Sequence, residues 1–137
     1  MTVAADTGAL YALVDKNDAW HKRVLDWWTA NGASVVVPVV VLPEVTYLLQ
    51  TRIGSAAEEA FMRSVADGEF PLEELEMEDV RRAVEVMHRY ADFPLGFVDA
   101  AIVAIAERLE TRELLTTDRR HFGTVRPKHA RSFVLLP

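Results

Sequence analysis

Short apolar runs of the kind that form buried strands alternate with segments of helical periodicity along this chain. The strand-like runs cover residues 2–5, 34–37, 70–75, 113–117 and 132–136. Apolar side chains at helical spacing cover residues 7–14, 18–31, 41–53, 56–66, 78–90 and 97–109, with Asp18 and Ser55 as expected helix caps. This alternation is typical of parallel strands joined by helical crossovers. It predicts an α/β fold with a five-stranded, mainly parallel sheet flanked by helices.

The chain is long enough for one hydrophobic core. It has 137 residues, 50% of them hydrophobic, and we expect one domain over residues 1–137. There are no cysteines, which excludes disulfides, thiolate metal sites and thiol nucleophiles. The amino-terminal residues do not resemble a secretion signal, and the apolar run 35–45 is too short to span a bilayer. We therefore expect a soluble cytoplasmic protein.

Four carboxylates occupy positions where a predicted strand ends or a predicted helix begins. Asp6 and Asp118 directly follow strand-like runs, whereas Glu44 and Asp99 fall in the first turns of helices. Each has an adequate structural explanation as a helix cap or a first-turn acid. However, Glu44 and Asp99 are surrounded by apolar residues, which indicates carboxylates held near the core. In a parallel sheet Asp6 and Asp118 lie at the carboxyl edge, whereas Glu44 and Asp99 need tertiary packing to join them there. One shared cation would compensate the charge of all four.

Hard divalent cations such as Mg²⁺ prefer oxygen ligands of this kind. The histidines show no zinc-binding spacing; they are His21, His88, His121 and His129. Of these, His121 either contacts a phosphate or is an ordinary surface residue. The chain lacks a G-x-S-x-G motif, a P-loop and a G-x-G-x-x-G loop, so an acidic metal site remains the best-supported chemistry.

Charge is unevenly distributed along the chain, although the formal net charge is −6. Residues 67–79 contain seven acidic residues and no Lys or Arg, whereas residues 119–131 contain five basic residues and no acid. The basic segment begins directly after Asp118. It is either a solvated surface loop or a phosphate-contacting rim beside the acidic pocket, and its position favours the rim.

Four segments together carry a resemblance to a known family. They are residues 6–10 (DTGAL), 43–45 (PEV), 97–101 (FVDAA) and 115–122 (LTTDRRHF). In this order and spacing they resemble the PIN-domain family, and more narrowly the VapC-type toxins of bacterial toxin–antitoxin pairs. The resemblance covers nearly the whole chain. It implies a small α/β ribonuclease that depends on Mg²⁺ or Mn²⁺.

The resemblance also implies roles for the acidic quartet Asp6, Glu44, Asp99 and Asp118 as the metal-binding and catalytic residues. The cation would activate water for attack on an RNA phosphodiester. Glu44 would either bind the cation through water or position the nucleophile, and the sequence does not separate these roles.

Other residues near the quartet are candidates for supporting roles. Thr7 and Thr117 flank expected ligands and are candidates to orient them by hydrogen bonds. Arg119 and Arg120 are candidates for contacts with RNA phosphates. Asp92 either ends the preceding helix or belongs to the site.

The resemblance implies further partners: an RNA substrate, a cognate VapB-type antitoxin and a second copy of the chain in a homodimer. Trp20, Trp27 and Trp28 form one stripe on a helix, which is core or part of a partner groove. Two alternatives remain. One is a degenerate PIN domain that only binds, and the other is a receiver-like or phosphoryl-transfer domain with an acidic metal pocket.

Overall fold

A five-stranded parallel sheet forms the centre of the computed structural model, which describes residues 2–137. Met1, part of the expected domain, lies outside the described residues. The strands are β1 (Val3–Ala5), β2 (Val35–Pro38), β3 (Leu72–Glu73), β4 (Glu113–Leu115) and β5 (Val134–Leu136). Their order is β3-β2-β1-β4-β5, and each neighbouring pair is parallel. The predicted fold class is confirmed.

The middle of the sheet is fully buried because helices cover both of its faces. Every residue of β1 has 0% exposure, as do Leu114 and Leu115 of β4. This burial explains why the strands read as continuous apolar runs and not as alternating patterns. Ala5 pairs with Leu115, and the backbone nitrogen of Asp6 donates to the carbonyl oxygen of Leu115 at 3.0 Å. The segments that follow β1 and β4 therefore start side by side.

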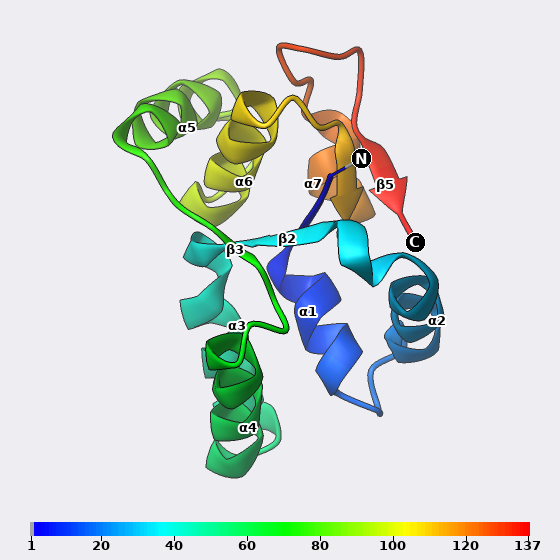
Figure 1. The fold of residues 1–137 in the computed structure, drawn as a ribbon. Helices are drawn as coiled ribbons and strands as arrows, with labels where there is room; N and C mark the ends of the chain where they lie inside the picture. The colour runs from blue at the N-terminus through cyan, green and yellow to red at the C-terminus, as the bar shows by residue number, and fades with distance from the viewer. Residues whose placement is uncertain (1) are drawn as a thin grey trace.

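Seven α-helices surround the sheet in the described part of the chain. They are α1 (Thr7–Val14), α2 (His21–Asn31), α3 (Leu42–Arg52), α4 (Ser55–Ala66), α5 (Met77–Arg89), α6 (Phe97–Arg108) and α7 (Arg119–Thr124), with 3-10 turns η1 (Gly32–Ser34) and η2 (Val39–Val41). Figure 1 shows α5 beside α6 and α3 beside α4. The predicted burial of α6 is confirmed, since a continuous run from Ala100 to Ala106 is buried. Between residues 2 and 137, no helix combines the length and apolarity needed to cross a bilayer.

Three local features differ from the sequence predictions. Helix α7 occupies the start of a segment that carried no helix prediction, because its six residues are too few to show a periodicity. Helix α2 begins at His21, since Asp18 uses its side chain to accept from the nitrogen of Trp20 in the preceding turn. Helix α4 includes Ser55 as its first residue, and Gly54 is the cap at φ 141°.

Two ion pairs fasten α6 to α5. The guanidinium of Arg108 donates to the carboxylate of Asp79 at 3.1 Å, and that of Arg82 donates to Glu107 at 2.8 Å. The Asp79 side chain is only 3% exposed, so loss of Arg108 would leave a buried charge unpaired. Because α6 also carries Asp99 in its first turn, these pairs help to fix the position of that carboxylate.

Candidate metal centre

Asp6 lies at the end of β1 and caps α1. One oxygen, Oδ1, accepts from the nitrogen of Ala9 at 2.8 Å, and Oδ2 accepts from the hydroxyl of Thr116 at 2.5 Å. The residue is 5% exposed. Burial raises the pKa of Asp6 from 3.8 to about 7; the two hydrogen bonds oppose this shift, while the charges of Asp99 and Asp118 add to it. Both charges therefore lie close to the Asp6 carboxylate.

Asp118 follows β4 and caps α7. Its Oδ1 accepts from the backbone nitrogen of His121 at 2.9 Å, and its own backbone nitrogen donates to the hydroxyl of Thr116 at 2.8 Å. The Thr116 hydroxyl thus contacts both the Asp6 side chain and the Asp118 backbone. From the sequence we selected the neighbouring Thr117 and missed Thr116. Side chains alternate between the two faces of an extended chain, so only one of these two threonines can face Asp6.

Asp99 approaches the same place from the first turn of α6. Burial raises the pKa of Asp99 from 3.8 to about 6; the charges of Asp118 and Glu44 add to this shift and His121 opposes it. The nitrogen Nδ1 of His121 lies 3.5 Å from Asp99 Oδ2 and 2.5 Å from Asp118 Oδ2. His121 therefore lies between two carboxylates of the quartet, a position that its sequence context alone did not indicate.

Glu44 lies on the exposed side of the first turn of α3. The prediction that its apolar neighbours would hold it near the core is wrong, because the helix buries Val45 and turns Glu44 outward. The hydroxyl of Thr7 donates to Glu44 Oε1 at 2.6 Å. The two residues line a cavity of about 240 Å³ together with Tyr47 and Leu48.

The donor set fits a divalent cation. One ligand atom each from Asp99, Asp118 and His121 lie within 4.8 Å of one another. Asp6 lies close enough to both aspartates for their charges to raise its pKa. Burial is the main reason that the pKa values of Asp6 and Asp99 are raised, and the neighbouring carboxylate charges add to it, so a bound cation would offset both effects. Hard carboxylate oxygens that gather without a cationic side chain of Lys or Arg are the ligands that Mg²⁺ and Mn²⁺ accept.

The two threonines predicted to support the site have different neighbours. Thr7 contacts Glu44, as described above. The hydroxyl of Thr117 faces Gly8 so closely that a Cβ at Gly8 would collide with it. Gly8 therefore allows the start of α1 to approach the end of β4, and any larger residue there would push these two elements apart.

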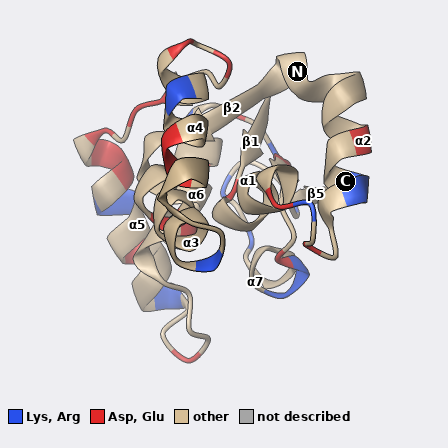
Figure 2. Cartoon of the chain, turned by 90° about the horizontal axis from the view of Figure 1, so that it is seen from below, with Lys and Arg blue, Asp and Glu red and all other residues tan. Residues whose placement is uncertain are grey.

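The two arginines predicted to contact RNA also differ from each other. The guanidinium of Arg119 donates to the carbonyl oxygens of Leu135 at 2.8 Å and Pro137 at 2.7 Å. Arg120 is exposed and its guanidinium lies 5.5 Å from the ring centroid of Phe93. Figure 2 shows acidic and basic positions side by side at the start of α7. Asp92 is exposed in the turn before α6.

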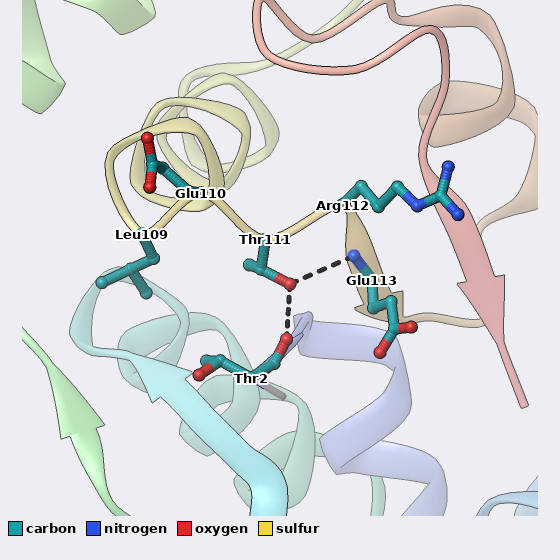
Figure 3. A pocket seen from close by; sticks show the side chains of 6 residues that line it. All are labelled: Thr2, Leu109, Glu110, Thr111, Arg112 and Glu113. Atoms are coloured by element: carbon teal, nitrogen blue, oxygen red, sulfur yellow. Dashed lines mark hydrogen bonds between the residues drawn. The ribbon is translucent and has the colours of Figure 1, made fainter.

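A separate cavity of about 220 Å³ lies at the opposite edge of the sheet (Figure 3). It is lined by Thr2, Leu109, Glu110, Thr111, Arg112 and Glu113. These residues lie just before β1 and at the start of β4, where amino ends of strands meet. The cavity is therefore remote from the acidic quartet, which occupies the carboxyl edge.

Comparison with known proteins identifies the family. The family model of the PIN domain matches residues 3–126. This chain belongs to the PIN-domain family. Ribonuclease VapC26 of Mycobacterium tuberculosis is 36% identical to this PIN domain over 132 residues, which are 96% of this chain and 98% of that protein.

Solved structures share the PIN fold with this chain. The crystal structure of VapC20 of Mycobacterium tuberculosis, a sarcin-ricin loop cleaving toxin, has a TM-score of 0.84 at 22% identity and covers 95% of this chain and 99% of its own. A toxin-antitoxin complex from Klebsiella pneumoniae has a TM-score of 0.67 at 20% identity, over 90% and 92% of the two chains. The resemblance of this PIN domain to VapC proteins, first indicated by four short segments, is confirmed.

Proposed function

We propose that this PIN domain is a metal-dependent ribonuclease and acts as a VapC-type toxin. The observation that carries the proposal is the meeting of Asp6, Asp99 and Asp118 at one edge of the sheet, with pKa values raised to about 7 and about 6 for the first two. The similarity to a ribonuclease over nearly the whole chain supplies the reaction class. The receiver-like alternative loses its support, because the chain belongs to the PIN-domain family.

Mg²⁺ or Mn²⁺ is the proposed cofactor, and Asp6, Asp99 and Asp118 are the proposed ligands. When bound, such a cation supplies positive charge that activates water and stabilises the charge that develops on the phosphodiester. The carboxylates must be ionised to hold it, so binding releases protons near pH 6 to 7, where Asp6 and Asp99 titrate.

The residues around the ligands have separate proposed tasks. Thr116 fixes the orientation of Asp6 through its hydroxyl. Glu44 is exposed at the rim, and its Oε1 is already engaged by Thr7, so Oε2 is free to accept a proton from an attacking water. Thr117 keeps the beginning of α1 close to the end of β4 through its packing on Gly8.

The basic segment after Asp118 is the proposed contact for RNA phosphates. Arg120 is exposed and available for this role. Arg119 contributes less than Arg120 to RNA binding, because two hydrogen bonds already hold its guanidinium to backbone carbonyls. A short stretch of positive charge next to the acidic site would bring the scissile phosphate toward the cation.

The proposed partners are a VapB-type antitoxin and a second copy of this chain, acting in the cytoplasm where RNA is abundant. Support comes from similar folds seen in a toxin-antitoxin complex. Trp20, Trp27 and Trp28 are only partly buried against the core, which is compatible with a partner groove on α2.

RNA cleavage by the purified protein tests the proposal. We expect cleavage in Mg²⁺ or Mn²⁺ and its loss in a chelator. Asp99→Asn should reduce the rate by at least about a hundredfold, since it removes a ligand on which several kcal/mol of transition-state stabilisation depend.

Asp92→Asn is the matched control, because it neutralises an exposed aspartate on the same segment and should keep the wild-type rate. Binding of RNA with no cleavage in either cation would favour the degenerate binding module instead. Cleavage by Asp99→Asn at the wild-type rate would remove the assigned site.

A further inference from the structure

We propose that His121 supplies a nitrogen ligand to the cation between Asp99 and Asp118, and that it thereby shifts the preference of the site from Mg²⁺ toward Mn²⁺. The inference rests on the proposed function and adds a fifth residue to its acidic quartet. It concerns which cation the site selects, because carboxylates alone offer only oxygen ligands.

The distances around His121 suit a ligand. Adjacent ligands of an octahedral cation with bonds of about 2.1 Å lie about 3 Å apart. The Nδ1 atom of His121 is 2.5 Å from Asp118 Oδ2 and 3.5 Å from Asp99 Oδ2, so these two separations bracket the required value. Shifts of about half an ångström in the carboxylates would complete the geometry.

The ring of His121 is held in place from several sides. Its backbone nitrogen donates to Asp118 Oδ1 at 2.9 Å, within the first turn of α7. Its ring packs edge-on against Phe93, with the centroids 5.2 Å apart and the planes at 73°. Nδ1 faces the carboxylates of Asp99 and Asp118, and the side chain as a whole is 26% exposed. A ligand that is oriented before the cation arrives loses little conformational entropy on binding.

Imidazole nitrogen changes the selectivity of a carboxylate site. Mg²⁺ prefers oxygen ligands and keeps its waters, whereas nitrogen ligands favour first-row transition ions. For Nδ1 to bind, its lone pair must face the cation and the ring proton must sit on Nε2. The competing arrangement has the proton on Nδ1, donated to Asp118. In that case His121 would only orient a carboxylate, and metal selectivity would not depend on it.

Electron spin echo envelope modulation of the Mn²⁺-loaded protein separates these arrangements. We expect modulation from a directly bound ¹⁴N, replaced by a ¹⁵N pattern when the protein is labelled with ¹⁵N-histidine. The signal should vanish in His121→Asn and persist in His88→Asn, the matched control on the exposed face of α5. The change from the ¹⁴N to the ¹⁵N pattern in the labelled wild type identifies a histidine ligand even if His121→Asn does not fold.

Calorimetric titration with each cation gives the second readout. His121→Asn should weaken Mn²⁺ binding by at least about tenfold, while Mg²⁺ binding changes less. Circular dichroism confirms that the variant is folded. Bound Mn²⁺ without nitrogen modulation in the wild type, or an equal loss of affinity for both cations, would overturn the inference. Absence of Mn²⁺ binding by the wild type would instead contradict the proposed metal site, and His121 as its ligand with it.

Discussion

Thr116 is the residue that joins the ends of the two central strands at the site. Its hydroxyl donates to Asp6 Oδ2 and accepts from the backbone nitrogen of Asp118, and the residue has 0% exposure. One acceptor and one donor that converge on this hydroxyl fix its orientation. Thr116 therefore couples the direction of the Asp6 carboxylate to the turn that presents Asp118.

Replacement of Thr116 by valine should weaken the site more than the fold. Thr116→Val keeps the shape but leaves the Asp118 nitrogen and one Asp6 oxygen without their partner. We expect a roughly tenfold loss of Mn²⁺ affinity and a decrease of about 1–3 kcal/mol in the free energy of unfolding. Thr116→Ser, which keeps the hydroxyl, should retain most of both. Equal cation affinity for the valine and serine variants would show that the hydroxyl does not position the ligand.

Asp6 should make the stability of the metal-free protein depend on pH. Its pKa is raised in the folded state from 3.8 to about 7, so the folded protein holds this proton more tightly than the unfolded chain. Stability contributed by the protonated form is present below about pH 4 and is lost as the pH rises to about 7. Asp6→Asn has no titrating carboxyl at this position, so its free energy of unfolding should not fall over this pH range.

Urea unfolding at pH 4, 6 and 8 measures that difference. The variant should gain stability relative to the wild type as the pH rises, by up to the order of 4 kcal/mol. Saturating Mn²⁺ should stabilise the wild type at pH 8 and leave the variant nearly unchanged, which serves as the control. A difference between the two proteins that is constant with pH would contradict the buried, uncompensated state of Asp6.

At the scale of elements, α7 depends on contacts at its amino-terminal end more than on its own length. A helix of six residues is marginal by itself. Asp118 caps it through the nitrogen of His121, and Arg119 ties its first turn to the carbonyl oxygens at the end of β5. The same helix presents the exposed Arg120. One short element thus carries a proposed ligand, a structural tether and a candidate phosphate contact.

Single substitutions should distinguish the structural role of Arg119 from the RNA-binding role of Arg120. Arg119→Gln removes two hydrogen bonds to backbone carbonyls and should lower the free energy of unfolding by about 1 kcal/mol. Arg120→Gln should leave stability unchanged but weaken RNA binding and reduce the salt slope of the affinity by about 1. The two variants act as controls for each other in thermal unfolding and in RNA binding at several salt concentrations. An unchanged salt slope for Arg120→Gln would remove the phosphate contact.

At the scale of the molecule, the sequence predicted the sheet and most helices because those patterns are local. Five apolar runs and six periodic segments needed no tertiary knowledge, and Asp6 and Asp118 were placed at the sheet edge by the strands before them. Helix α7 was missed because its six residues are too few to show a periodicity and its tether reaches carbonyl oxygens 16 and 18 residues further along the chain. The exposure of Glu44 was predicted wrongly, since apolar neighbours in sequence do not fix which side of a helix turn faces the core.

The roles of Thr116 and His121 emerge only from the fold. Each contacts Asp118, which is near in sequence, and one aspartate from a distant element. Neither has a residue type or spacing that distinguishes it from ordinary strand or surface residues. The pairing of β1 with β4 brings Thr116 to Asp6 across 110 positions. The packing of α6 beside α7 brings His121 to Asp99.

The central claim is that the carboxylates of Asp6, Asp99 and Asp118, which come from three separate parts of the fold, hold one divalent cation at the carboxyl edge of the sheet. Anomalous scattering from crystals of the metal-free protein soaked in MnCl₂ tests it most directly. We predict one dominant peak within about 2.5 Å of carboxylate oxygens of Asp99 and Asp118, with Asp6 adjacent. A peak elsewhere on the molecule, or saturated soaks with no peak between these residues, would contradict the account.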